Sequence, residues 1–157
     1  MKSLYILSIV LILVSLACNN RKPSEELLNK KAAIPASFKF DKNLKVITSS
    51  FNRKNNTMST LYGNELALKT AIAGNVSYPS GENFTLVTWK QQNDDRWFGA
   101  RIPGDLLSVE VIKTTGTGRA AISYQKFEGR DLNATSDTLQ QQERIKYILA
   151  QKPSVMP

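Results

Sequence analysis

Few side chains in this 157-residue sequence could carry out covalent or metal chemistry. The sequence contains no histidine and a single cysteine, Cys18. Without imidazole it excludes Ser-His-Asp and Cys-His catalysis, zinc sites with histidine ligands and a histidine general base. A lone thiol cannot hold an iron–sulfur cluster or close a disulfide within the chain. Enzymes that depend on these groups are therefore excluded, and a non-enzymatic role is favoured.

Two other patterns that could suggest a site have a simpler structural interpretation. Gly116-Thr117-Gly118 lies between two expected strands and is not followed by a helix that could receive a phosphate. It therefore predicts a hairpin loop. Asp94-Asp95 next to Arg96 is a carboxylate pair in a polar stretch, and such a stretch is typical of an exposed loop.

Cys18 ends an apolar segment that has the form of an export signal. Lys2 precedes an apolar run from Leu4 to Leu16. This run is shorter than the roughly 20 residues that a membrane-spanning helix needs, so a cleaved signal peptide is expected. The sequence Val14-Ser15-Leu16-Ala17-Cys18 resembles the lipobox of bacterial lipoproteins, although Ser15 stands where leucine is usual. An ordinary signal peptide with an incidental cysteine is the alternative.

The lipobox resemblance implies a location and a first partner. In such proteins the cysteine is acylated and becomes the new N-terminus, and several acyl chains anchor stably. We therefore expect an envelope protein held to a membrane by lipid on Cys18, facing the periplasm or the cell surface. Asn19 follows the cysteine where inner-membrane retention signals usually have aspartate, which favours the outer membrane.

The charge balance limits the other partners. Removing residues 1–17 removes one lysine and leaves 20 basic and 13 acidic residues, a net charge of +7. Such an excess favours an anionic surface or an acidic envelope partner. The basic residues are scattered, and nucleic acid is not expected as a partner of an exported protein.

The elements that must position any site form one domain. We expect a signal peptide at 1–17, an anchor and tether with a short helix (Ser24 to Ala33) at 18–36, and a folded domain at 37–157. Alternation and turn residues predict strands at 44–51, 57–62, 84–90, 96–102, 107–113 and 120–127. Helical spacing, caps and stops predict helices at about 64–74 and 137–151. The fold class is therefore α+β, mainly an antiparallel sheet with a short central helix and a C-terminal helix.

Three sequence blocks resemble the cytochrome P460 family. They are Thr57-Met58-Ser59-Thr60-Leu61-Tyr62-Gly63-Asn64-Glu65-Leu66-Ala67, then Tyr78-Pro79-Ser80-Gly81 with Leu86-Val87-Thr88-Trp89-Lys90, and then Trp97-Phe98-Gly99-Ala100-Arg101-Ile102-Pro103-Gly104. The resemblance implies a compact sheet-rich domain, commonly with a c-type haem, and suggests a homodimer. Some members oxidise hydroxylamine, and others in the wider group bind small gases.

The C-terminal helix departs from that family in its haem chemistry. Members attach haem through Cys-x-x-Cys-His near the C-terminus, whereas this chain has Asp137-Thr138-Leu139-Gln140-Gln141-Gln142-Glu143-Arg144. Covalent haem c is therefore excluded. The lysine–haem cross-link of P460 has no matching position here, and Lys90 is a candidate by proximity alone.

Two hypotheses follow from these residues. The favoured one is a haem-free binding or accessory module that holds a small apolar molecule or docks to a redox or envelope partner. The alternative is a noncovalent haem protein for small-molecule redox chemistry or gas binding. In that case Tyr62, Met58 or Lys90 would supply the axial ligand and Trp89 and Trp97 would line the pocket, with Tyr78, Tyr124 and Tyr147 as further ligand candidates. Core packing is the simpler interpretation of these side chains.

Overall fold

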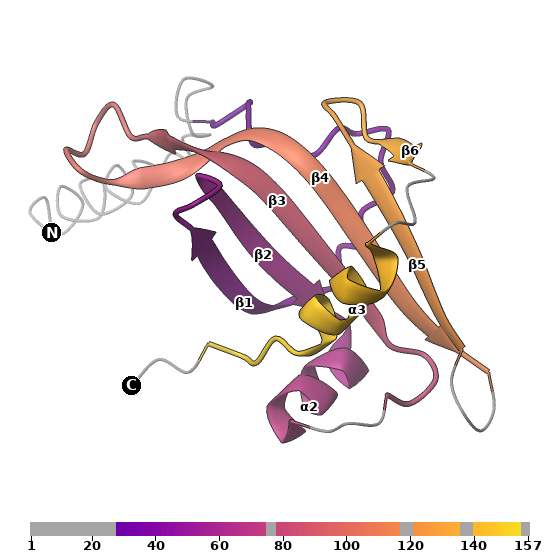
Figure 1. Cartoon of the computed structure of the whole chain (residues 1–157). Helices are drawn as coiled ribbons and strands as arrows, with labels where there is room; N and C mark the ends of the chain where they lie inside the picture. The colour runs from indigo at the N-terminus through magenta and orange to yellow at the C-terminus, as the bar shows by residue number, and fades with distance from the viewer. Residues whose placement is uncertain (1–27, 75–77, 117–120, 136–139, 155–157) are drawn as a thin grey trace, which may run out of the picture.

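One twisted antiparallel sheet of six strands forms the frame of the domain. The computed structural model describes residues 28–74, 78–116, 121–135 and 140–154. The strands lie in the sheet in the order of the chain, each hydrogen-bonded to the next. They are β1 (Lys45–Asn52), β2 (Thr57–Gly63), β3 (Asn83–Asn93), β4 (Arg101–Thr115), β5 (Ala121–Glu128) and β6 (Asn133–Thr135). The predicted α+β class with one domain is confirmed (Figure 1).

Within the described residues, two helices lie on one face of this sheet. The first, α2 (Glu65–Ala73), begins at Asn64, whose side chain accepts a hydrogen bond from the Ala67 amide, and ends at Gly74 with φ +64°. The second is α3 (Gln141–Leu149). The predicted start of this last helix, with Asp137 and Thr138 as caps, lies outside the described residues. No helix within the described ranges is long and apolar enough to cross a bilayer.

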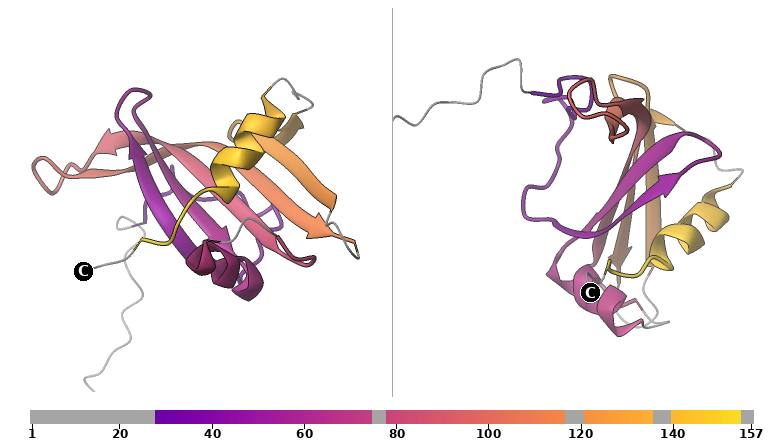
Figure 2. Two further views of the ribbon diagram at one scale, coloured as in Figure 1. Left: turned by 60° about the horizontal axis from the view of Figure 1, so that its bottom comes forward. Right: turned by 90° about the vertical axis from the view of Figure 1, so that its left-hand side faces the viewer.

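Each face of the sheet has its own apolar cluster. The helix-side cluster is built of Ile47, Leu61, Ala67, Phe84, Leu86, Ile112, Ile145 and Ile148. The opposite cluster contains Val87, Trp89, Leu106, Val109 and Leu132, covered by the segment 32–40. Figure 2 shows α3 and this segment on opposite sides of the sheet. The segment 32–40 is therefore part of the core.

The prediction of a short helix from Ser24 to Ala33 is wrong for residues 28–33. Residues 28–33 form turns, closed by hydrogen bonds from the Ala32 amide to the Asn29 carbonyl and from the Ala33 amide to the Lys30 carbonyl. Residues 24–27 lie outside the described ranges. The Trp89 indole donates to the Ala32 carbonyl at 2.9 Å, so contacts with the sheet override the local helical preference.

The strand predicted at 96–102 and the break predicted at 103–105 are also wrong. Residues 94–100 form the loop between β3 and β4, and β4 runs through Pro103 and Gly104 without interruption. Irregular pairing accommodates both residues, since the register shifts between Trp89 and Gln91, which pair with Leu106 and Pro103. A bulge is where a strand tolerates proline and glycine. The short strand β6 was not predicted.

Candidate functional site

A polar groove lies between the sheet and α3. It encloses about 710 Å³. It is lined by residues of β1 to β5, of the loop between β1 and β2, and of α3 with the preceding Gln140. Its floor comes from β1 to β5 and its wall from α3, with Gln140, Arg144 and Tyr147 on the helix side. The strands hold the floor rigidly, because each is paired on both sides except at β1.

A row of small hydroxyl side chains crosses four strands at the floor of this groove. Ser50 of β1 pairs with Ser59 of β2, Ser59 pairs with Thr88 of β3, and Thr88 pairs with Ser108 of β4. All four line the groove. The Ser59 and Thr88 hydroxyl oxygens are 3.1 Å apart and share a hydrogen bond. We call these four residues the hydroxyl row. Cross-strand partners share a face, so the row follows directly from the register.

The helix side of the sheet becomes apolar towards α2. The next row of partners contains Leu61 and Leu86 and then Glu110, and the row after it contains Gly63, Phe84 and Ile112. Ile145 and Ile148 of α3 pack on this apolar part. The helix side of the sheet therefore combines a core at one end with a polar groove at the other.

A charged cluster lies at the boundary between the apolar core and the polar groove. It consists of Glu110, Arg144 and Tyr124. The Arg144 guanidinium donates from Nε to Glu110 Oε1 at 2.9 Å and from Nη2 to Oε2 at 2.5 Å. The Tyr124 hydroxyl donates to Glu110 Oε1 at 2.6 Å. This bidentate geometry is the strong form of an arginine–carboxylate pair. The cluster ties β4, β5 and α3 together.

Burial and the ion pair shift the pKa values in this cluster. Burial, and then hydrogen bonding to the Glu110 carboxylate, raise the pKa of Tyr124 well above its ordinary value. Hydrogen bonding to Glu110 raises the pKa of Arg144. The Tyr124 hydroxyl therefore stays protonated and donates a hydrogen bond, and Arg144 stays a cation. Neither side chain would act as a general acid or base at neutral pH. The role of the cluster is to hold Glu110, Arg144 and Tyr124 in place and to keep the Glu110 and Arg144 charges paired.

The structure separates the residues that the sequence suggested for a cofactor. Met58 and Trp89 are cross-strand partners, and Tyr62 lies on the same face as both. This face is the one covered by the segment 32–40, opposite to the groove. Strand alternation places Lys90 on the other face, where it is exposed, and Trp97 lies in the β3–β4 loop, also exposed. These five residues therefore do not form one site.

Tyr62 and Trp89 are engaged in packing. The Tyr62 ring meets Phe40 edge-on, with centroids 5.3 Å apart, and burial raises the pKa of its hydroxyl. A raised pKa disfavours the phenolate that an iron ligand would need. The Trp89 indole is hydrogen-bonded to the chain at Ala32. The packing interpretation given to these residues agrees with their surroundings.

The groove residues do not fit haem. Haem needs an axial histidine, cysteine, methionine or tyrosine and largely apolar walls. Among the described residues lining the groove, Tyr147 is the one side chain of these types, and its ring lies against the Arg144 guanidinium at 4.9 Å. Hydroxyls and a buried ion pair occupy the floor instead. A second hollow of about 520 Å³, between residues 37–41 and β3 to β5, is lined by none of the four ligand types.

The hydroxyl row and the charged cluster were not predicted from the sequence. Thr88 and Ser108 each stand between two apolar residues of a strand, and that pattern could have indicated inward-facing hydroxyl groups. Glu110 stands between Val109 and Val111 in an apolar strand, and that pattern could have indicated a buried carboxylate. Its partner Arg144 is 34 residues away and could not be identified from spacing.

Comparison with known proteins identifies one family. The model of the family described as cytochrome P460 matches residues 38–143, which is more than half of the chain. The match begins in the segment that covers the sheet and ends inside α3. A search of the curated proteins gives no match.

Proposed function

The chain belongs to the cytochrome P460 family, and we propose that it is a haem-free binding module of the cell envelope. In this proposal the groove under α3 holds a small polar molecule in place of a porphyrin. The observation that carries it is the hydroxyl row, because it lines the groove with hydrogen-bonding groups, whereas a haem pocket needs largely apolar walls.

The groove chemistry favours a polyhydroxylated ligand such as a sugar. Each serine or threonine hydroxyl both donates and accepts, which matches the hydroxyl groups of a sugar. Phe51 lines the rim and is exposed, so its ring is available to the apolar face of such a ligand. Tyr147 also lines the groove, with its ring packed against the Arg144 guanidinium. Arg53 and Asn55 add further donors at the rim. The polar floor argues against the apolar ligand expected from the sequence.

The proposal also includes an anchor and a location. We expect a lipid on Cys18 to hold the module to an envelope membrane, with the outer membrane favoured by Asn19. Support comes from the apolar run and the lipobox-like sequence. Growth with an alkyne-tagged fatty acid tests this, since the wild-type chain should be labelled and the Cys18→Ala chain should not.

A titration with two kinds of probe tests the groove. The purified protein is titrated calorimetrically with haemin and with a panel of glucose, galactose, N-acetylglucosamine and trehalose. We expect binding of at least one sugar and no stoichiometric uptake of haemin. Tight haemin binding, or no response to any sugar, would contradict the proposal.

A matched pair of double variants ties any binding to the groove. Ser59→Val with Thr88→Val removes a cross-strand hydroxyl pair from the floor, and removing both partners leaves no orphaned donor. Ser49→Val with Thr60→Val removes a similar pair, 3.0 Å apart, that does not line the groove. Sugar binding should be lost in the first variant and kept in the second.

A further inference from the structure

Two aromatic side chains project into solvent at the tip of the β3–β4 hairpin. The tip, defined as residues 94–100, carries Trp97 with 71% of its surface exposed and Phe98 fully exposed. Figure 1 shows this hairpin extending past the rest of the sheet. Exposed adjacent aromatics on a loop mark an interaction surface, and tryptophan in particular is enriched at the membrane–water interface.

The backbone of the tip holds these side chains outward. The Ala100 amide donates to the Trp97 carbonyl at 3.0 Å, which closes a turn with Phe98 and Gly99 at its corner. Gly99 has φ +78°, as the third residue of a type II turn requires. The Asp94 amide donates to the Ala100 carbonyl at 3.0 Å and closes the base of the loop. The exposure of Phe98 is therefore built into the turn.

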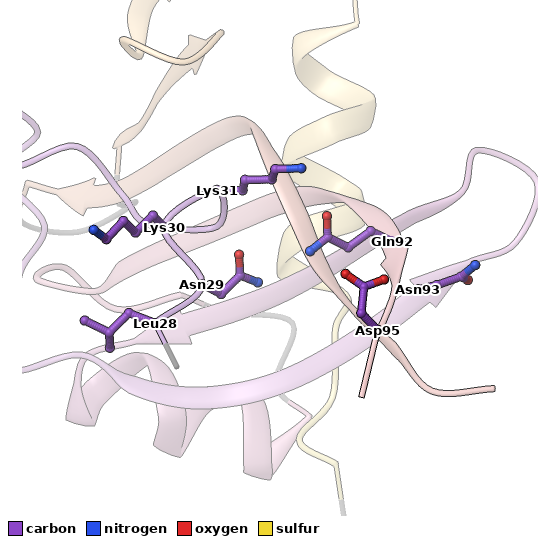
Figure 3. Close-up of a pocket in the computed structure, with 7 residues that line it drawn as sticks. All are labelled: Leu28, Asn29, Lys30, Lys31, Gln92, Asn93 and Asp95. Carbon is purple, nitrogen blue, oxygen red and sulfur yellow. The ribbon is translucent and has the colours of Figure 1, made fainter. Parts of the chain in front are cut away.

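The start of the described chain lies against the same hairpin. Asn29 Nδ2 donates to the Pro103 carbonyl at 2.6 Å. A shallow pocket of about 680 Å³ is lined by residues 28–31 together with Gln92, Asn93 and Asp95, as Figure 3 shows. A smaller adjoining hollow of about 290 Å³ is lined by Leu28, Trp97 and Ile102 among others. The chain therefore enters the fold beside the hairpin tip.

Chain length then places this end of the molecule close to the anchor. Leu28 is ten positions after Cys18 in the sequence. Ten residues reach about 35 Å when fully extended. A lipid on Cys18 would therefore keep Leu28, and the hairpin beside it, within that distance of the bilayer, whatever path the linking residues take.

The charge of this end suits an anionic lipid surface. Residues 28–31 contribute Lys30 and Lys31, and residues 94–102 contribute Arg96 and Arg101 against Asp94 and Asp95. The sum is four basic and two acidic side chains, a local charge of +2. Basic side chains near anionic head groups strengthen attachment to a membrane.

From these observations we propose that the hairpin tip docks onto the bilayer, with Trp97 and Phe98 inserted at the level of the lipid head groups. This inference rests on the anchoring part of the proposed function. It gives the domain a fixed orientation on the membrane, and it does not involve the groove under α3.

Tryptophan fluorescence tests this directly, because the chain contains only Trp89 and Trp97. The lipidated protein is reconstituted into vesicles of phosphatidylethanolamine and phosphatidylglycerol, with and without bromine on the acyl chains. Bromine quenches tryptophan at close range. We expect the wild-type emission to fall in brominated vesicles and the emission of Trp97→Phe, which reports buried Trp89 alone, to stay nearly unchanged.

The possible results separate this inference from the anchor. If wild-type protein is acylated and vesicle-bound but bromination leaves its emission unchanged, the docking inference is wrong while the anchor stands. A second copy of the chain covering the tip would give this same unchanged emission. If the protein is not acylated and does not bind the vesicles, the anchoring proposal is wrong and the docking inference falls with it.

Discussion

The Arg144 guanidinium donates hydrogen bonds to both oxygens of the Glu110 carboxylate and so holds α3 over β4. The Glu110 side chain is 2% exposed, and that of Arg144 is 35% exposed. A buried carboxylate without partners is costly, so Glu110 depends on Arg144 and on the Tyr124 hydroxyl. This pair gives the groove its polar wall and connects the last helix to the sheet.

Arg144→Leu should destabilise the fold by about 2–4 kcal/mol. This range lies slightly below that for breaking a fully buried ion pair, because the guanidinium is partly exposed. The cost arises from the Glu110 carboxylate left without its main partner. Urea denaturation of the purified protein measures it.

Two comparisons sharpen that measurement. Lys126→Met breaks the more exposed Lys126–Glu128 pair and should cost no more than about 1 kcal/mol. Glu110→Leu combined with Arg144→Leu should be less harmful than Arg144→Leu alone, since no charge remains buried. A double variant as unstable as the sum of both single variants would contradict this account.

Glu82→Met should stabilise the protein at neutral pH, by about 1 kcal/mol. Glu82 is almost completely buried, and neither carboxyl oxygen has a hydrogen-bond partner among the described residues. Burial raises the pKa of Glu82 above 4.5, and the Thr70 hydroxyl opposes this only in part. Between the unfolded pKa and the higher folded pKa, the folded state therefore retains a proton that the unfolded state has lost.

The sign of the pH dependence follows. Stability from Glu82 is fully present below the unfolded pKa of about 4.5 and falls as pH rises towards the folded pKa. The advantage of Glu82→Met over wild type should therefore grow with pH above about 4.5 and then level off. Urea midpoints measured from acidic to neutral pH test this, and an advantage that is constant with pH would contradict it.

Trp89→Phe should cost about 1–2 kcal/mol, because it removes the indole hydrogen bond to Ala32 and leaves a small void under the segment 32–40. Trp97→Phe is the matched control and should change stability by no more than about 0.5 kcal/mol, since Trp97 is exposed. Urea denaturation followed by circular dichroism measures both. Equal effects would show that the two tryptophans do not differ in burial.

Gly63→Ala should destabilise the protein by about 1–3 kcal/mol through overpacking. A Cβ at Gly63 would lie 2.6 Å from Ile47 Cδ1 and 3.0 Å from Ala67 Cβ. Ile47→Val removes the Cδ1 methyl group, so it should cost less in the Gly63→Ala background than in wild type. A thermal-unfolding double-mutant cycle tests this, and strictly additive costs would contradict it.

Local patterns predicted the elements whose signals lie within a few residues. The strands at β1, β2, β3 and β5 and the helix α2 were expected within a few residues of their observed bounds. Asn64 and Gly74 cap α2 as the sequence suggested, because caps depend on local hydrogen bonds and on φ. The break expected at Pro103-Gly104 failed because a bulge, which depends on the neighbouring strand, absorbs both residues.

The candidate site depended on information that local patterns do not contain. The hydroxyl row requires the register of four strands, which sets Ser50, Ser59, Thr88 and Ser108 side by side. The Glu110–Arg144 pair requires the packing of α3 on the sheet. The family blocks and the absence of histidine pointed to the fold and to the loss of covalent haem, and neither located the groove.

An absorption spectrum distinguishes a haem-free module from a haem protein in this cytochrome P460 family domain. The protein is expressed in a haem-replete periplasm, purified, and measured before and after addition of haemin, with a pyridine haemochrome assay. We expect a folded, colourless protein without a Soret band in either sample. A stoichiometric Soret band that survives purification and is lost in Tyr62→Phe or Tyr147→Phe would contradict it and establish a noncovalent haem protein.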